Sequence, residues 1–100
     1  MSDPESIKKD VVVIGAGLTG LTLSFYLKKY GKDFLTLEKS NRPGGYINTQ
    51  QKDGFTFESG PNTGVIGNPE TVELFKEIAD KAKVEVAGDE VKKRYVLNLL

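Results

Sequence analysis

The 100-residue sequence contains no cysteine and no histidine. Without cysteine, neither a disulfide framework nor a thiolate metal site can form. Without histidine, the chain lacks the commonest metal ligand and the commonest side-chain base at neutral pH. Zinc enzymes and hydrolases that use a Cys-His or Ser-His pair are therefore excluded within these residues. We predict no catalytic side chain and no metal ligand in this chain.

An excess of charge and long apolar runs are also missing. Fourteen basic and fourteen acidic residues give a formal net charge of zero, which provides no electrostatic footprint for nucleic acid. No run approaches the roughly 18 apolar residues that span a bilayer, and residues 1–10 are polar and charged, unlike a secretory signal. The sequence therefore predicts a cytoplasmic protein. Its hydrophobic fraction of 38% is enough for a core.

The strongest positive signal is a glycine-rich turn between a predicted strand over 11–14 and a predicted amphipathic helix. Gly15, Gly17 and Gly20 have the spacing G-x-G-x-x-G of dinucleotide-binding turns. Gly15 would turn the chain out of the strand, Gly17 would let a pyrophosphate approach the backbone, and Gly20 would let the helix pack closely. The helix N-terminus then holds a diphosphate through backbone N–H groups and its dipole, without a basic side chain.

A second predicted strand over 34–37 ends at an acidic residue. Ser24 is small enough for the helix to lie on the sheet, and Gly31 should end that helix. Glu38 follows about 20 residues after the glycine turn, where a carboxylate accepts hydrogen bonds from ribose hydroxyls. A carboxylate there disfavours the phosphorylated ribose of NADP. The fingerprint by itself leaves FAD and NAD open.

The residues after Glu38 favour FAD. Lys39, Arg42, Gly44 and Gly45 form a basic turn with a double glycine, in which the guanidinium can pair with a phosphate and the glycines can lie against a ring or a second phosphate. A pure NAD domain would continue with a second crossover helix. Instead, alternating residues over 46–51 and 55–58, on either side of an Asp-Gly pair, predict a β-hairpin.

The last third predicts a helix followed by two short strands. Asn68 can cap the helix, with Pro69 at its first position. One helical face would bury Val72, Phe75, Ile78, Ala79 and Ala82. Strands are expected over 84–87 and 93–97, around a turn at 88–89.

These elements predict an α/β fold: a Rossmann-like FAD/NAD(P)-binding βαβ unit with a β-hairpin and a following helix. Residues 1–9 are expected to be a flexible N-terminus. Residues 10–100 are expected to be part of an FAD-binding domain, with the remainder of that domain and a substrate domain absent.

The combined motifs resemble the N-terminal segment of the flavin-dependent amine oxidase superfamily and, within it, the protoporphyrinogen oxidases. The resemblance covers residues 10 to about 97. The glycine turn and the Arg-x-Gly-Gly turn are shared with monoamine oxidases and carotenoid desaturases. The narrower indicator is the segment over 57–63, Phe-Glu-Ser-Gly-Pro-Asn-Thr. Tyr46 is a departure, because many members carry an arginine there, and an aromatic ring cannot supply a guanidinium.

The resemblance implies a noncovalent FAD that takes hydride from protoporphyrinogen and yields protoporphyrin, a late step of haem synthesis. It places Gly60, Pro61, Asn62 and Thr63 near the isoalloxazine. The residues assigned to FAD are Gly15, Ala16, Gly17, Leu18, Thr19, Gly20, Glu38, Lys39, Arg42, Gly44, Gly45, Tyr46, Gly60, Pro61, Asn62 and Thr63.

The family is several times longer than this chain, so the chain alone is expected to be inactive. A porphyrinogen would be the substrate of the full-length protein, and membrane-surface contact would involve only absent regions. Exposed sheet edges and an apolar face favour homo-oligomerisation. Two alternatives remain: another amine oxidase or carotenoid desaturase of the superfamily, and a noncatalytic nucleotide-binding module.

Overall fold

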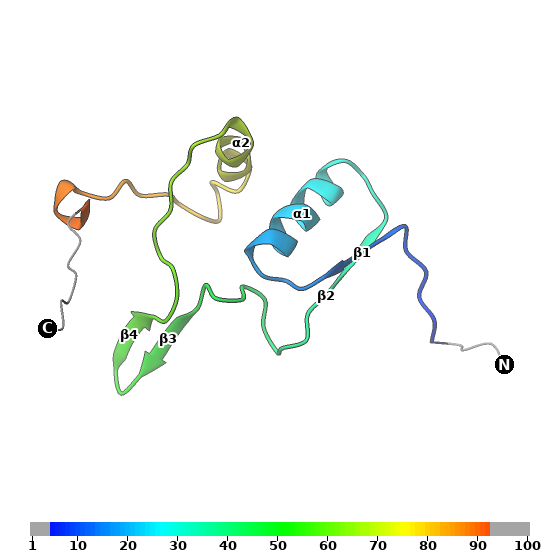
Figure 1. Ribbon diagram of the computed structural model, residues 1–100, viewed down its shortest axis with the longest axis horizontal. Helices are drawn as coiled ribbons and strands as arrows, with labels where there is room; N and C mark the ends of the chain where they lie inside the picture. The colour runs from blue at the N-terminus through cyan, green and yellow to red at the C-terminus, as the bar shows by residue number, and fades with distance from the viewer. Residues whose placement is uncertain (1–4, 93–100) are drawn as a thin grey trace, which may run out of the picture. The chain divides into compact units, whose positions relative to one another are not determined.

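The computed structural model describes residues 5–92, and the predicted strand over 93–97 lies outside them. Its elements are β1 (Val11–Ile14), α1 (Leu18–Lys29), β2 (Phe34–Leu37), β3 (Thr49–Lys52), β4 (Phe55–Glu58), α2 (Pro69–Glu77) and the 3-10 helix η1 (Asp89–Lys92) (Figure 1). The chain forms two compact units, divided after Gly64. Among the described residues, none of the helices has both the length and the apolar character that a membrane span requires.

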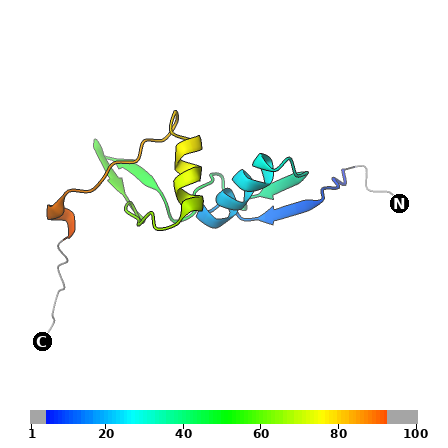
Figure 2. The same ribbon diagram turned by 90° about the horizontal axis from the view of Figure 1, so that it is seen from above.

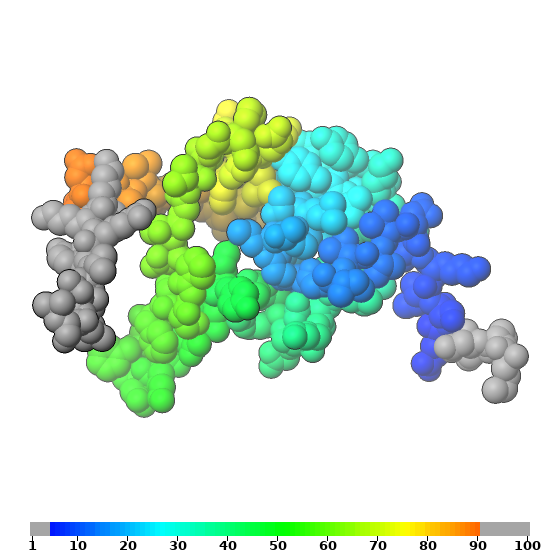
Figure 3. Space-filling view, in the orientation of Figure 1, coloured from blue at the N-terminus to red at the C-terminus, as the bar shows by residue number. Residues whose placement is uncertain are grey.

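The first unit begins with the predicted βαβ arrangement. β1 and β2 pair in parallel, from Val11 opposite Phe34 to Ile14 opposite Leu37. Two parallel strands need a crossover connection, and α1 provides it by lying along one face of the pair (Figure 2). In the space-filling view, the residues from β1 through β2 form one contiguous block (Figure 3). The predicted strand bounds, 11–14 and 34–37, are confirmed.

The end of α1 is fixed by a glycine, as the sequence predicts. Gly31 has a φ of +67°, a conformation that residues with a side chain rarely adopt. Its N–H donates to the Lys28 carbonyl at 3.1 Å, and the Lys32 N–H donates to the Leu27 carbonyl at 2.9 Å. This pair of bonds is a Schellman motif, which satisfies the last carbonyls of a helix.

Contact between α1 and the strands depends on small residues. A Cβ on Gly20 would overlap the Gly15 carbonyl oxygen, and Val13 and Ala16 are the buried apolar residues here. The Ser24 hydroxyl donates to the Gly20 carbonyl at 2.7 Å and lies 2.6 Å from the Thr36 hydroxyl on β2. The helix therefore lies directly on the backbone of the glycine turn and is hydrogen-bonded to the second strand.

The other face of the parallel pair is open. Val12, Ile14 and Leu37 are 49%, 79% and 46% exposed. They share this face because side chains alternate along a strand and paired residues of neighbouring strands point the same way. The sequence would allow both faces to be covered, since the strands are apolar throughout, as in parallel sheets buried on both sides.

The predicted hairpin is present, but its first strand is shorter than predicted. β3 and β4 are antiparallel, with Thr49 opposite Glu58, and the turn residues Asp53 and Gly54 have φ values of +53° and +81°, typical of a type I′ turn. The predicted strand from residue 46 is wrong for its first three residues. A tight turn, in which the Ile47 N–H donates to the Gly44 carbonyl at 3.1 Å, delays the strand to Thr49.

The second unit contains α2, which begins as predicted. The Asn68 side-chain oxygen accepts the Thr71 N–H at 2.8 Å, and Pro69 is the first helical residue. The predicted burial of the apolar face of α2 is wrong: Phe75 and Ile78 are half-buried, and Val72, Ala79 and Ala82 are exposed. Four residues of that face, Val72, Phe75, Ala79 and Ala82, line an open hollow together with Ile66 and Val84. The helix ends at Glu77, earlier than predicted, and turns continue over 78–82.

The predicted strand over 84–87 is wrong. These residues are exposed and irregular, and the predicted turn at 88–89 is replaced by the start of η1. A strand is stable only when its backbone groups pair with another strand. Within residues 5–92, this segment has no such partner.

We predict that Gly20→Ala destabilises the first unit by about 2 kcal/mol, because the new methyl would meet the Gly15 backbone, which cannot move aside without breaking the turn. Urea unfolding followed by circular dichroism measures this. Gly67→Ala is the matched control, since a Cβ there meets nothing within 4 Å. Equal stability of the two variants would contradict the prediction.

Candidate functional site

The glycine turn presents an open helix N-terminus. Gly15 has a φ of +97°, and its N–H donates to the Leu37 carbonyl at 2.7 Å, which anchors the turn to β2. Gly17 is the N-cap of α1, where no side chain caps the helix and no acidic residue lies in the first turn. A Cβ on Gly17 would meet nothing within 4 Å. The start of α1 therefore carries no side-chain cap and no acidic side chain, and the space beside Gly17 is unobstructed, as an anion-binding helix N-terminus requires.

Glu38 connects this turn to the segment that follows β2. One carboxylate oxygen accepts the Ala16 N–H at 2.9 Å, and the other accepts the Ser40 N–H at 2.8 Å. These bonds, the one from Ala16 first, lower the pKa of Glu38 from 4.5 to about 2. The charge of neighbouring Lys39 contributes to this lowering. Glu38 is therefore ionised at neutral pH.

The same carboxylate keeps capacity for a ligand. An ionised carboxylate offers about four lone-pair positions, and the Ala16 and Ser40 bonds use two of them. The remaining positions can accept ribose hydroxyls, the task of the acidic residue that follows the glycine turn by about 20 residues in dinucleotide-binding domains. The residue predicted to bind ribose thus also organises the loop beside it.

The double glycine lies against the glycine turn. The Gly44 N–H donates to the Ala16 carbonyl at 2.7 Å, and a Cβ on Gly45 would lie 3.2 Å from the Gly17 Cα. Gly44 and Gly45 have φ values of +112° and +59°. Two glycine segments that the sequence shows nearly 30 residues apart therefore form one surface in the folded chain.

Arg42 is half-buried and occupied by its own loop. Nη1 donates to the carbonyls of Pro43 at 3.1 Å and Ile47 at 3.3 Å, and Nη2 donates to the Gly45 carbonyl at 2.7 Å. The sequence predicts a phosphate partner for this guanidinium. In the structure of the free chain, three of its five N–H donors hold backbone carbonyls instead.

The residues predicted near the isoalloxazine are only partly joined to this surface. A Cβ on Gly60 would overlap the Tyr46 carbonyl oxygen, so Gly60 lies directly against that backbone. The Tyr46 side chain itself is 90% exposed. Pro61, Asn62 and Thr63 follow in exposed, irregular backbone. Leu18 and Thr19, also predicted cofactor contacts, are exposed on the first turn of α1.

Ser40 is a residue that the sequence analysis missed. Its N–H binds Glu38, and its hydroxyl donates to the Arg42 carbonyl at 2.8 Å. A serine two residues after an acid and two before an arginine is a local turn signal. That spacing could have identified it.

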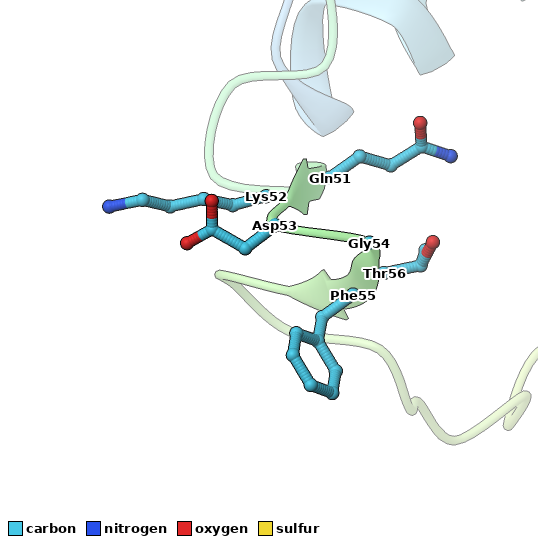
Figure 4. A pocket seen from close by; sticks show the side chains of 6 residues that line it. All are labelled: Gln51, Lys52, Asp53, Gly54, Phe55 and Thr56. Atoms are coloured by element: carbon cyan, nitrogen blue, oxygen red, sulfur yellow. The ribbon is translucent and has the colours of Figure 1, made fainter.

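A separate hollow lies at the tip of the hairpin. Around it, Gln51 and Thr56 point to one side of the turn, whereas Lys52 and Asp53 point to the other (Figure 4). The diverging side chains create no set of groups aimed at a common ligand. The glycine turns and Glu38 therefore remain the candidate site.

We predict that Glu38 makes the stability of the first unit depend on acid pH. Its folded-state pKa is depressed, so its contribution is complete above pH 4.5 and is lost as the pH falls toward 2. Glu38→Gln should lower stability at neutral pH and flatten this part of the profile, which urea unfolding across pH measures.

Asp33→Asn is the control for that measurement. The hydrogen bond from Lys9, 2.8 Å long, lowers the pKa of Asp33 as well. Asp33→Asn should therefore remove only the loss of stability at acid pH that comes from the exposed Lys9–Asp33 pair. Parallel profiles for the wild type and Glu38→Gln would refute the assignment to Glu38.

Comparison with known proteins agrees with this geometry. The model of the NAD(P)-binding Rossmann-like domain family matches residues 13–78. Coproporphyrinogen III oxidase of Staphylococcus aureus is 42% identical over 72 residues, which cover 70% of this chain and 16% of that protein. A possible lysine-specific histone demethylase 1 of Drosophila melanogaster is 43% identical over 70 residues, which cover 68% of this chain and 8% of that protein.

Comparison with solved structures also finds a flavin-dependent oxidase. A double mutant of putrescine oxidase superposes with a TM-score of 0.64 at 30% identity, covering 71% of this chain and 16% of that one. These matches confirm the Rossmann-like fold, the resemblance to flavin-dependent oxidases and FAD as the cofactor. The chain belongs to the NAD(P)-binding Rossmann-like domain family.

Proposed function

We propose that this chain is the FAD-binding, N-terminal part of a flavin-dependent oxidase that dehydrogenates a porphyrinogen. The observation that supports this best is the convergence of three segments: the uncapped glycine turn, the ionised Glu38 and the double glycine at 44–45. The glycine turn matches the diphosphate of an adenine dinucleotide and Glu38 matches its free ribose, while the double glycine borders the same surface.

Each segment has a distinct task in holding the cofactor. The N–H groups at the start of α1 would receive the pyrophosphate, since Gly17 leaves the approach open. Glu38 would accept the adenosine ribose hydroxyls and repel a ribose phosphate, which selects against NADP. Gly44 and Gly45 border the same surface, and Tyr46 and residues 60–63 extend toward the flavin side in this proposal.

The bound flavin would supply the redox chemistry by accepting hydride from the macrocycle. The residues of this chain would bind and orient it. Glu38 does not serve as a base at neutral pH, because its pKa of about 2 leaves it a very weak proton acceptor.

Two arguments favour a porphyrinogen over other substrates. The segment over 57–63 resembles that of porphyrinogen oxidases, and a relative of 42% identity is a coproporphyrinogen III oxidase. The relatives also include a possible histone demethylase and a putrescine oxidase, so the glycine turns alone select no substrate. Protoporphyrinogen and its coproporphyrinogen precursor are both to be tested.

The proposal includes a cytoplasmic location, which cell fractionation would test. It also includes self-association, which light scattering would test.

Gly17→Ala should weaken FAD binding by about tenfold to a hundredfold, because the methyl would block the pyrophosphate from charge-assisted backbone bonds. The free chain should keep its stability, since that methyl meets no neighbour within 4 Å. Quenching of flavin fluorescence on titration with the wild type and the variant measures this. Equal affinities would contradict the proposed pyrophosphate position.

A chimera tests whether this chain can serve as the FAD-binding segment of a porphyrinogen oxidase. This chain spans 16% of the length of the Staphylococcus aureus oxidase. We expect that protein to retain flavin and to convert coproporphyrinogen or protoporphyrinogen to its fluorescent porphyrin when this chain replaces its matching segment. The unaltered oxidase and a chimera with Gly20→Ala are the positive and negative controls. A folded chimera that binds no flavin would overturn the proposal.

A further inference from the structure

The guanidinium of Arg42 forms a bridge across its own turn. Its two terminal nitrogens donate to the carbonyls of Pro43, Gly45 and Ile47, at 2.7 to 3.3 Å. A charged donor makes stronger hydrogen bonds than a neutral one, and the planar fork of arginine fixes several acceptors at once. The side chain therefore closes the turn from residue 43 to residue 47.

The shape of the turn depends on this bridge. Gly44 and Gly45 both have positive φ, and glycine has the largest conformational freedom to lose on ordering. A Cβ on Gly44 would lie 3.2 Å from Arg42 Nη1 and 3.0 Å from the Ile47 carbonyl oxygen. The absence of that Cβ leaves room for the guanidinium, which then holds two flexible residues in one conformation.

Two sets of contacts connect the Arg42 turn to the glycine turn. Toward the double glycine, the Gly44 N–H donates to the Ala16 carbonyl, and Gly45 lies against Gly17. Toward Glu38, the Ser40 hydroxyl binds the Arg42 carbonyl, and the Ser40 N–H binds the carboxylate that holds the Ala16 N–H. Both routes from Arg42 therefore end at the backbone of the glycine turn.

We propose that Arg42 is a positioning residue, which sets the double glycine against the glycine turn before a ligand arrives, rather than a residue that binds FAD through its charge. The expected effect of Arg42 on FAD affinity rests on the proposed FAD site. The expected effect of Arg42 on the conformation of the turn concerns the chain without FAD.

Amide hydrogen exchange measured by NMR on the full 100-residue chain tests the structural part. The reporters are the N–H groups of Gly44 and Ile47, which bind the Ala16 and Gly44 carbonyls. The references are Gly31 and Lys32, whose bonds belong to the end of α1. Arg42→Lys keeps the positive charge but lacks the planar guanidinium, and Arg42→Gln removes both. Lys52→Gln is the control, because it removes a positive charge from the exposed strand β3.

We expect Arg42→Lys and Arg42→Gln to raise exchange at both reporters about tenfold, with the references and Lys52→Gln unchanged. Both Arg42 variants should weaken FAD binding by a similar factor, and the dependence of FAD affinity on salt should remain that of the wild type. The ammonium group of lysine cannot replace the planar guanidinium, so Arg42→Lys should not recover the protection of the reporters or the affinity for FAD.

Three results would overturn the inference. In the first, Arg42→Lys keeps both the protection of the reporter N–H groups and the affinity for FAD. Arg42→Gln then loses FAD affinity and its dependence on salt, although the reporters stay protected. That pattern would show that Arg42 binds a phosphate of FAD through its charge. In the second, the reporters stay protected in both variants. In the third, the references lose protection as much as the reporters, which makes the effect global. If the wild type binds no FAD, the proposed function fails, and the exchange data still decide the role of Arg42.

Discussion

The close approach of α1 to the turn after β1 is the contact on which the rest of the first unit depends. Gly20 places the helix backbone directly against the Gly15 carbonyl, and the Ser24 hydroxyl meets Thr36 of β2. Because the helix lies so close, its uncapped N-terminus opens at the end of β1. A residue with a side chain at position 20 would displace the helix and with it the N–H groups that a diphosphate needs.

From this contact the site is assembled by backbone bonds more than by side chains. The Ala16 backbone donates to Glu38 and accepts from Gly44, so one residue joins the end of β2 and the double glycine. Such a site is suited to a cofactor that carries the reactive group itself, since the protein then has to bind and orient it. The lack of histidine and cysteine is consistent with that division of work.

The apolar surface of the first unit is incompletely covered. Ile14 is 79% exposed on the face opposite α1, and Phe55 of the hairpin is 73% exposed. Exposed apolar faces and unpaired strand edges favour association with further protein. The chain also spans 16% of the length of the oxidase it matches. Burial in this unit is concentrated where the helix meets the glycine turn, at Val13 and Ala16.

The sequence by itself determined the βαβ unit, the hairpin turn and the cap of α2, because each depends on residues close together in the chain: glycines with positive φ, an Asp-Gly pair, and asparagine before proline. Tertiary structure alone decided the partners of Glu38 and Arg42, the contact of Gly45 with Gly17, and the absence of a strand over 84–87. Hydrogen-bond donors do not specify their acceptors in a sequence, and a strand forms only where a partner strand is available.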